Sequence, residues 1–174
     1  MDRLSGQEYK DIYGRVPRSC VDTILLAPGS EPDLMVGRDG ICNAGGPLEF
    51  ALVQRSIPPY LGHWHLPGGT LRRHESILAA SRRLVAAETG IERNRAFVIG
   101  SYEILSEEGQ VEIDGVMQPV ELHSVVHVVL AFASTRELKR DSNADRIGWF
   151  SEMPTPYIPA HGEWLVARRF ARDA

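Results

Sequence analysis

The chain of 174 residues contains very little cysteine, and Cys20 and Cys42 are its two thiols. They lack the C-x-x-C spacing typical of zinc sites and redox motifs, and they do not indicate a disulfide framework. We therefore expect both thiols to be reduced and the protein to be cytoplasmic. The N-terminal stretch "MDRLSGQEYK" also lacks the apolar core of a signal peptide.

Clusters of positive charge and long apolar runs are also missing. The net charge is -4 with a pI near 5.9, and no basic run reverses this balance. Such a charge gives no general attraction to nucleic acid or to an anionic membrane. No apolar stretch approaches the ~18 residues that span a bilayer. We expect no nucleic-acid partner and no membrane partner.

Strand-like segments separated by Gly- and Pro-rich loops make up most of the sequence. The predicted strands are Cys20–Ala27, Glu49–Arg55, Arg95–Leu105, Gly109–Asp114, Glu121–Ala133 and Arg146–Phe150, with a short strand at Leu34–Val36. We expect Gly109–Asp114 to be the hairpin partner of Arg95–Leu105. The most apolar strand, Glu121–Ala133, should be central. A C-terminal helix is predicted near Gly162–Ala171.

One strong helix is predicted in the middle of the chain, within "PGGTLRRHESILAASRRLVAAETGI". Glu75 and Ser76 suit a first turn, because an acid there complements the helix dipole, and Gly90 suits the position just past the end. A continuous apolar stripe predicts the face that packs on the sheet, at Ile77, Ala80, Leu84 and Ala87. These elements predict an α/β (α+β) sandwich with a mixed β-sheet core.

Two glycines, Gly68 and Gly69, precede this helix, where glycine permits close backbone approach to a phosphate or a metal. The spacing resembles the box of the Nudix hydrolases: Gly, five residues, Glu, seven residues, Arg-Glu, apolar, any, Glu-Glu, any, Gly, apolar. The matching residues are Gly69, Glu75, Arg83, Val85, Glu88, Gly90 and Ile91. The resemblance implies a single Nudix domain over residues 1–174 with a Nudix-like sandwich fold. Its box spans 69–91, and a hairpin insertion lies at about 28–47.

The box of this chain has lost two of its acids. The family places carboxylates at i, i+3 and i+4 on one helix face, where they hold hard divalent cations. Leu84 and Ala87 occupy two of these positions, and Glu88 keeps the third. One carboxylate cannot build a cluster of two or three metals, so we expect at most one Mg²⁺, with Mn²⁺ as an alternative.

One branch of the family has a box thinned in the same way. The run "RLVAAETG" resembles that of the GDP-mannose mannosyl hydrolases, which keep only the last glutamate. Weaker similarity covers about residues 15–151 and places Asp22 and Arg55 at functional positions of that branch. The resemblance implies a magnesium-dependent enzyme that binds a nucleoside diphosphate sugar. In such an enzyme, water displaces the nucleoside diphosphate at the anomeric carbon and releases the sugar.

The same resemblance implies a role for each matching residue. The carbonyl of Gly68, the carboxylate of Glu88 and the amide oxygen of Asn143 would bind magnesium. Asp22, Arg55 and Arg83 would bind the diphosphate and the sugar, and the catalytic residues would be Glu88, Arg83 and Asp22.

Three of these residues also have plain structural interpretations. Asp22 can cap a turn, and Arg55 can be a solvated residue at a strand end. Arg83 can pair internally with Glu75 or Glu88 instead of contacting substrate. The sequence leaves these alternatives open.

The general base of the branch is missing from this chain. Ala144, next to Asn143, stands at the position of the catalytic histidine. Candidates to replace it are Asp145 and two histidines of the predicted central strand, His123 and His127. These two histidines share one face of the strand, and they can also bind the nucleobase or the sugar of the substrate. The alternative is that both histidines are core or edge residues.

Two further functions remain open. An ordinary Nudix pyrophosphohydrolase would cut between phosphorus atoms of a nucleoside diphosphate derivative, with acids from other loops such as Glu107, Glu108 or Glu121. A non-catalytic Nudix-like ligand-binding domain is suggested by Leu84, Ala87 and Ala144 together. A homodimer is also left open.

Overall fold

The computed structural model describes residues 4–38, 40–46, 48–57, 60–139 and 144–171. Within these ranges the helices are α1 (Gly6–Tyr13), α2 (Ile77–Thr89) and α3 (Pro159–Ala167). The strands are β1 (Arg18–Leu26), β2 (Leu34–Gly37), β3 (Gly40–Asn43), β4 (Phe50–Arg55), β5 (Trp64–His65), β6 (Gly68–Thr70), β7 (Arg93–Ile113), β8 (Val116–Ala133) and β9 (Ala144–Phe150). None of the described helices is long and apolar enough to cross a membrane.

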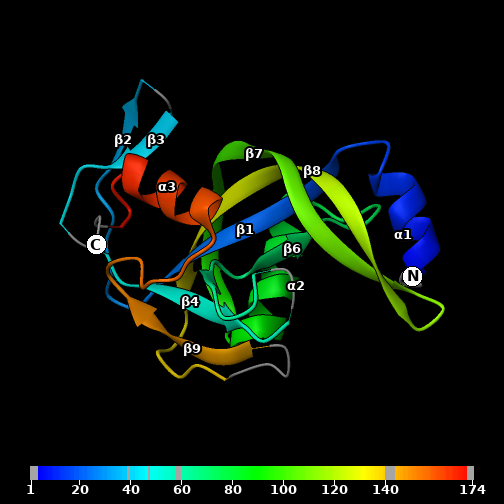
Figure 1. Cartoon of the computed structure of the whole chain (residues 1–174). Coiled ribbons are helices and arrows are strands. Elements are labelled where there is room, and N and C mark those ends of the chain that lie inside the picture. The colour runs from blue at the N-terminus through cyan, green and yellow to red at the C-terminus, as the bar shows by residue number, and fades with distance from the viewer. Residues whose placement is uncertain (1–3, 39, 47, 58–59, 140–143, 172–174) are drawn as a thin grey trace.

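Seven strands form one mixed sheet in the order β5-β4-β1-β8-β7 (Figure 1), with β6 paired to β1 and β9 paired to β4. Strands β1 and β8 are parallel, and the other pairs are antiparallel. β2 and β3 form a separate two-stranded hairpin within residues 28–47, where the sequence predicted an insertion. The mixed sheet with its helices confirms the predicted α/β sandwich.

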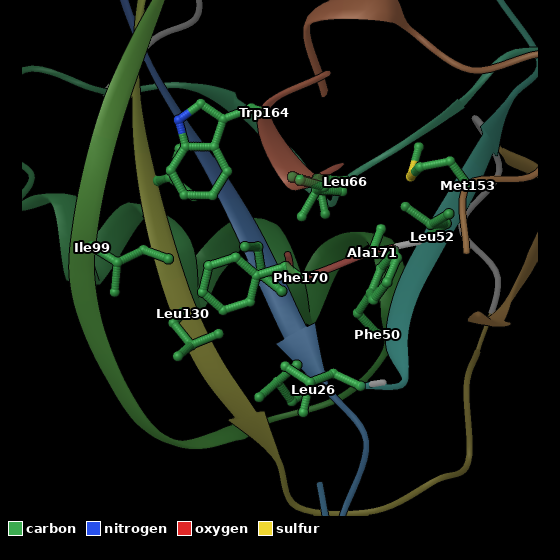
Figure 2. Close-up of a cluster of buried hydrophobic side chains, with 14 of the residues drawn as sticks. Leu26, Phe50, Leu52, Leu66, Ile99, Leu130, Met153, Trp164, Phe170 and Ala171 are labelled. Atoms are coloured by element: carbon green, nitrogen blue, oxygen red, sulfur yellow. The ribbon is translucent and has the colours of Figure 1, made fainter. Parts of the chain in front are cut away.

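Side chains alternate between the two faces of β1 and β8, and each face packs against a different helix. One face, which we call the α3 face, packs Ile24, Val128 and Leu130 against Trp164 of α3. Figure 2 shows this largest cluster, which also contains Leu26, Phe50, Leu52, Leu66, Ile99, Met153 and Phe170. The opposite face, the α2 face, packs Val21, Leu25, Val129 and Ala131 against Ala80, Leu84 and Val85 of α2.

The longest strands form one extended hairpin, and here one prediction was wrong. Gly109–Asp114 is the continuation of β7 rather than its partner, which is β8. The chain turns at Asp114 and Gly115, with φ values of 51° and 79°. An Asp-Gly pair at positive φ is the strong signal for a two-residue hairpin turn. Gly109 only introduces a position without a side chain inside the strand.

The short helix α1 was not predicted from the sequence. It begins with a capping box, in which the side chains and backbones of Ser5 and Glu8 bond each other. Figure 1 shows α1 against the distal part of the β7–β8 hairpin, where Lys10 donates a 2.9 Å hydrogen bond to Gln118. The predicted C-terminal helix exists as α3, but it begins earlier, at Pro159, a residue that suits the first helical position.

Candidate active site

Capping residues define where helix α2 begins and ends, and these limits determine the position of Glu88. The hydroxyl of Ser76 caps the helix by accepting a 3.2 Å hydrogen bond from the backbone N–H of Ala79. Gly90 ends it in the left-handed conformation, with φ at 69°, and donates to the carbonyl of Ala86. Glu88 therefore lies on the last helical turn, as the sequence predicted.

Glu88 and Gly68, which the resemblance assigns to a metal, are in contact. The Gly68 N–H donates a 3.3 Å hydrogen bond to Oε2 of Glu88. The backbone bonds Leu71 N–H to Ser19 O and Thr23 N–H to Pro67 O flank the pairing of Gly68 with Asp22. In an antiparallel ladder, hydrogen-bonded pairs alternate with pairs that are not hydrogen-bonded. The pair of Thr23 with Pro67 is hydrogen-bonded, so the next pair, Asp22 with Gly68, is not. The N–H and C=O of Gly68 therefore point away from β1.

This geometry fits a divalent cation. The carbonyl of Gly68 lies on the same strand edge as its N–H, on the side of the Glu88 carboxylate. One carboxylate and one carbonyl are hard oxygen donors of the kind that Mg²⁺ uses while it keeps several waters and binds a substrate phosphate. Asn143, the third expected ligand, lies outside the described residues.

Asp22 lies on the other side of Gly68, in the middle of β1. A Cβ on Gly68 would overlap Oδ1 of Asp22, so only glycine lets the two strands approach this closely. The other oxygen, Oδ2, accepts a hydrogen bond from the hydroxyl of Tyr102 on β7. It also lies 3.4 Å from Nε2 of His161 on α3. The carboxylate is buried, and it is held by three elements rather than capping a turn.

Two histidines flank this carboxylate, and the backbone N–H and C=O of Leu66 bond to one each. Its N–H donates to Nδ1 of His161 over 3.2 Å, so the proton of a neutral His161 is on Nε2. Its carbonyl accepts from Nδ1 of His65 over 2.7 Å, so the proton of a neutral His65 is on Nδ1. The two imidazoles are therefore opposite tautomers, and the N–H of His161 faces Asp22.

Burial determines the charge of these groups. It raises the pKa of Asp22 from 3.8 to about 6, although the hydrogen bond from Tyr102 opposes part of the rise. It lowers the pKa of His161 from 6.5 to about 3 and that of His65 to about 4. Both imidazoles are therefore neutral at pH 7, beside an acid that titrates close to neutrality.

Arg55 lies at the end of β4, on the same side of the molecule as the two histidines. Its positive charge contributes to the lowered pKa of both His65 and His161, and its Nε donates to the carbonyl of Ile57 over 3.4 Å. Ala144, the residue at the missing histidine position, is its partner on β9. The structure thus pairs Arg55 with Ala144 across the strands, and the charge of Arg55 reaches His65 and His161.

Arg83 makes the internal pairing that the sequence left open. Its Nε and Nη2 each donate a 2.7 Å hydrogen bond to Glu75, and Nη2 also donates to the carbonyl of Thr70 over 3.2 Å. This bidentate pair raises the pKa of Arg83 and lowers that of Glu75. Arg83 therefore ties α2 to the loop that follows the glycines, and its guanidinium is committed to that contact.

The two altered positions of the box have different environments. Leu84 is buried against Val21 and Val129 on the α2 face. Ala87 is exposed, so the predicted apolar stripe is wrong at its last member. The residues buried along α2 are Ala80, Ser81, Leu84, Val85 and Thr89. In the described part of the chain, no group of three or more His, Cys, Asp or Glu residues could hold a metal ion.

The other candidate residues lie away from Asp22. His127 pairs with Val21 across the sheet, and His123 has the same parity along β8. Both side chains therefore belong to the α2 face, whereas Asp22 belongs to the α3 face. Asp145 is exposed on β9. Glu107, Glu108 and Glu121 lie farther out, on the distal part of the β7–β8 hairpin.

Sequence reasoning did not identify Tyr102, His65 or His161 as residues of the site. Tyr102 is 80 residues from Asp22 in the sequence, and no local motif surrounds it. His161 had one signal: it is the only histidine of the predicted C-terminal region, close to a Pro-initiated helix. A neutral histidine that accepts a hydrogen bond from a backbone N–H can be recognised as part of a site only when its partners in the fold are known.

Comparison with known proteins places this geometry in a family. The profile of the NUDIX domain matches residues 40–168, and the chain belongs to the Nudix hydrolase family. No curated protein gives a significant match. Nudix hydrolases typically use a divalent metal.

Solved structures show the same fold. A MutT NUDIX hydrolase from Burkholderia pseudomallei is 23% identical with a TM-score of 0.59, covering 88% of this chain and 98% of its own. The NUDIX domain of Shewanella oneidensis NrtR, complexed with ADP ribose, is 20% identical with a TM-score of 0.59, covering 88% and 86%. RenU, a Nudix hydrolase from M. Smegmatis, is 20% identical with a TM-score of 0.55, covering 87% and 84%.

Proposed function

We propose that this protein is a divalent-metal-dependent hydrolase of a nucleoside diphosphate sugar, similar to the GDP-mannose mannosyl hydrolases. Water forms a bond to the anomeric carbon, the bond between that carbon and the diphosphate oxygen breaks, and the water gives up a proton. The products are the free sugar and a nucleoside diphosphate. The observation that carries the proposal is the thinned metal site, in which Glu88 is the single acid at the end of α2.

A single-cation site suits attack at carbon better than attack at phosphorus. The leaving diphosphate gains negative charge in the transition state, and one Mg²⁺ bound by Glu88 and the Gly68 carbonyl would stabilise that charge. Leu84 packs into the α2 face, so this helix offers no second inward carboxylate.

Three further residues would bind the substrate or position the site. Arg55 would bind the diphosphate through its guanidinium. Asp22 would bind sugar hydroxyls through the carboxylate that lies between Gly68 and the two histidines. Arg83 acts through the loop, because its bonds to Glu75 and Thr70 hold the segment after the glycines in place.

The position of the broken bond gives a direct test. Purified protein is incubated with Mg²⁺, a panel of nucleoside diphosphate sugars and H₂¹⁸O, and the products are analysed by mass spectrometry. We expect ¹⁸O in the released sugar and none in the nucleotide. Label in a nucleoside monophosphate or a sugar phosphate would replace the proposal with pyrophosphohydrolysis. No turnover on any member of the panel would favour a non-catalytic ligand-binding domain.

One comparison favours pyrophosphohydrolysis, or ligand binding, as the second candidate. The NrtR domain holds ADP ribose on the same fold, and this ligand is a nucleoside diphosphate derivative. ADP ribose is therefore included in the panel, as substrate and as ligand. Cleavage of ADP ribose between its phosphorus atoms, without release of any sugar from the other substrates, would establish this second candidate.

A further inference from the structure

His161 bridges the two chain segments that meet at the candidate site. Its Nδ1 accepts from the N–H of Leu66, two residues before Gly68, and its Nε2 lies 3.4 Å from Oδ2 of Asp22. The side chain is buried, with 9% of its surface exposed. Helix α3, the last element of the fold, therefore contacts both the glycine loop and β1 through one imidazole.

Tyr102 donates a hydrogen bond to the same carboxylate oxygen, which His161 approaches only as a 3.4 Å contact. It comes from β7, opposite Val126 of β8, on the α3 face of the sheet. With Tyr102 and His161 both at Oδ2 and Gly68 against Oδ1, rotation of the Asp22 carboxylate is opposed from three sides. A carboxylate with 8% of its side chain exposed is thus fixed in one orientation.

The tautomer of His161 is also fixed by the fold. A backbone N–H can only donate, so Nδ1 of His161 must be the acceptor and Nε2 must carry the proton. His65 shows the reverse arrangement on the carbonyl of the same residue, Leu66. The donor facing Asp22 therefore depends on the Leu66 peptide, and hence on the loop that leads to Gly68.

We propose that His161, together with Tyr102, is a positioning residue that holds the Asp22 carboxylate in register with the Gly68 loop for contact with the sugar of the substrate. This inference rests on the proposed function, because it takes Asp22 as the sugar-binding acid. His161 itself does not touch the reacting atoms. The 3.4 Å between Nε2 of His161 and Oδ2 of Asp22 is longer than an ordinary hydrogen bond.

Two amide substitutions separate the two contacts of His161. His161→Gln can place an amide N–H near the position of Nε2 and keep the donor to Asp22, whereas His161→Asn keeps only an acceptor near Nδ1. Tyr102→Phe removes the other donor. We expect Tyr102→Phe to lower kcat about tenfold with little change in KM, since a hydrogen bond to a charged group is worth this much. His161→Asn removes a longer contact and should lower kcat by less, with His161→Gln retaining more activity.

A double-mutant cycle with Asp22→Asn shows whether the effect passes through that carboxylate. In the Asp22→Asn background, His161→Asn and Tyr102→Phe should lower kcat no further. His74→Gln, an exposed histidine in the loop before α2, is the matched control and should leave kcat unchanged. Full additivity with Asp22→Asn, or unchanged kcat in both single variants, would overturn the positioning role.

The ring tautomers provide a readout that needs no substrate. Long-range ¹H–¹⁵N correlation spectra of the full-length wild-type protein at neutral pH should show His161 as the Nε2–H tautomer and His65 as the Nδ1–H tautomer. The opposite tautomer at His161, or a charged ring, would overturn the inference even if His161 variants fail to fold. Absence of sugar release by the wild-type protein would instead contradict the proposed function, so the two failures are distinguishable.

Discussion

The two faces of the central strands differ sharply in chemistry although they share a backbone. On β1, Asp22 points to the α3 face and meets a hydroxyl and an imidazole, whereas Val21, one residue earlier, points to the α2 face and meets Ala80 and Leu84. Among the described residues, the contacts of the α2 face include the 2.8 Å hydrogen bond between the buried hydroxyls of Thr23 and Ser81.

This difference shows where a thinned Nudix box can still support chemistry. The face that carries the box helix has become an apolar packing surface at Leu84, and only the last turn keeps an acid. The polar groups gather instead on the far face, around Asp22, where they come from β1, β7, the segment before β6, and α3. The candidate site therefore depends on the end of α2 and on the α3 face, and not on the middle of α2.

The largest expected effect comes from charging the α2 face. Leu84→Glu would bury an unpaired carboxylate against Val21 and Val129, and we expect it to lower the free energy of unfolding by about 4 kcal/mol. Ala87→Glu, three residues on, is exposed and should change it by less than ~0.5 kcal/mol. Urea denaturation measures both. Equal midpoints for the two variants would show that Leu84 is not buried in an apolar α2 face as described.

The next largest effect concerns the acid at the end of α2. Glu88→Gln keeps an acceptor for the Gly68 N–H but loses the negative charge, so the fold should survive while metal-dependent turnover falls by at least ~10²-fold, the upper range for loss of a residue that only supports a ligand. Glu92→Gln, on an exposed residue just past the helix, is the control and should keep its turnover. Wild-type turnover in Glu88→Gln would remove the metal assignment.

A gain of activity is expected at the strand that faces Arg55. Ala144→His restores a proton acceptor opposite that arginine, and turnover on the correct nucleotide sugar should rise about tenfold, less than the ~10²–10⁴-fold of an evolved base because the new ring is not pre-oriented. Ala144 is buried, so the melting temperature is measured in parallel. A folded variant with unchanged turnover would mean that this position does not face the reacting sugar.

The smallest effect is a dependence of stability on pH that arises from the α3 face. The folded-state pKa values of His65 and His161, about 4 and about 3, lie below the ordinary 6.5. The unfolded chain therefore takes up these protons first, and stability that is present above pH 6.5 is lost as the pH falls. Asp22, with a folded-state pKa of about 6 against 3.8, takes up its proton first when folded, which opposes the loss below pH 6.

Between pH 6 and pH 5, protonation of the two imidazoles in the unfolded chain lowers stability, and protonation of the Asp22 carboxyl in the folded protein raises it. The free energy of unfolding should therefore fall by about 1 kcal/mol. In His161→Gln the remaining imidazole and the carboxyl nearly cancel, and the curve should become flat. Chemical denaturation at several pH values tests both statements. A wild-type stability that rises on acidification over this interval would show that the imidazoles are already charged in the folded protein.

The sequence could predict those residues of the site whose positions follow from spacing within one short segment. The glycines, Glu88 on the last turn and Gly90 past the helix end all follow from a pattern within 69–91, because helix periodicity and glycine conformation are local properties. The apolar stripe failed at Ala87 for a local reason too. Ser81 is buried through its bond to Thr23, so the true packing face includes a polar residue that hydrophobic periodicity does not count.

The part that could not be predicted depends on long-range pairing. Tyr102 and His161 reach Asp22 only because β7 and β8 pair in one register and α3 crosses the same face. His123 and His127 illustrate the same limit in reverse, since their shared parity was evident but the face they occupy was not. The hairpin partner was misassigned although the turn signal at Asp114 and Gly115 was present in the sequence.

The extended β7–β8 hairpin has a consequence for how copies of this protein meet. β7 is the last strand on one side of the sheet, and such an open edge invites pairing with another chain. Apolar side chains stand exposed along the hairpin, including Leu105 and Met117. Yet from Arg95 to Arg136 the sequence has no intervening Lys or Arg and carries six acids, at Glu103, Glu107, Glu108, Glu112, Asp114 and Glu121. Two identical edges therefore repel each other, which guards the protein against strand-to-strand aggregation.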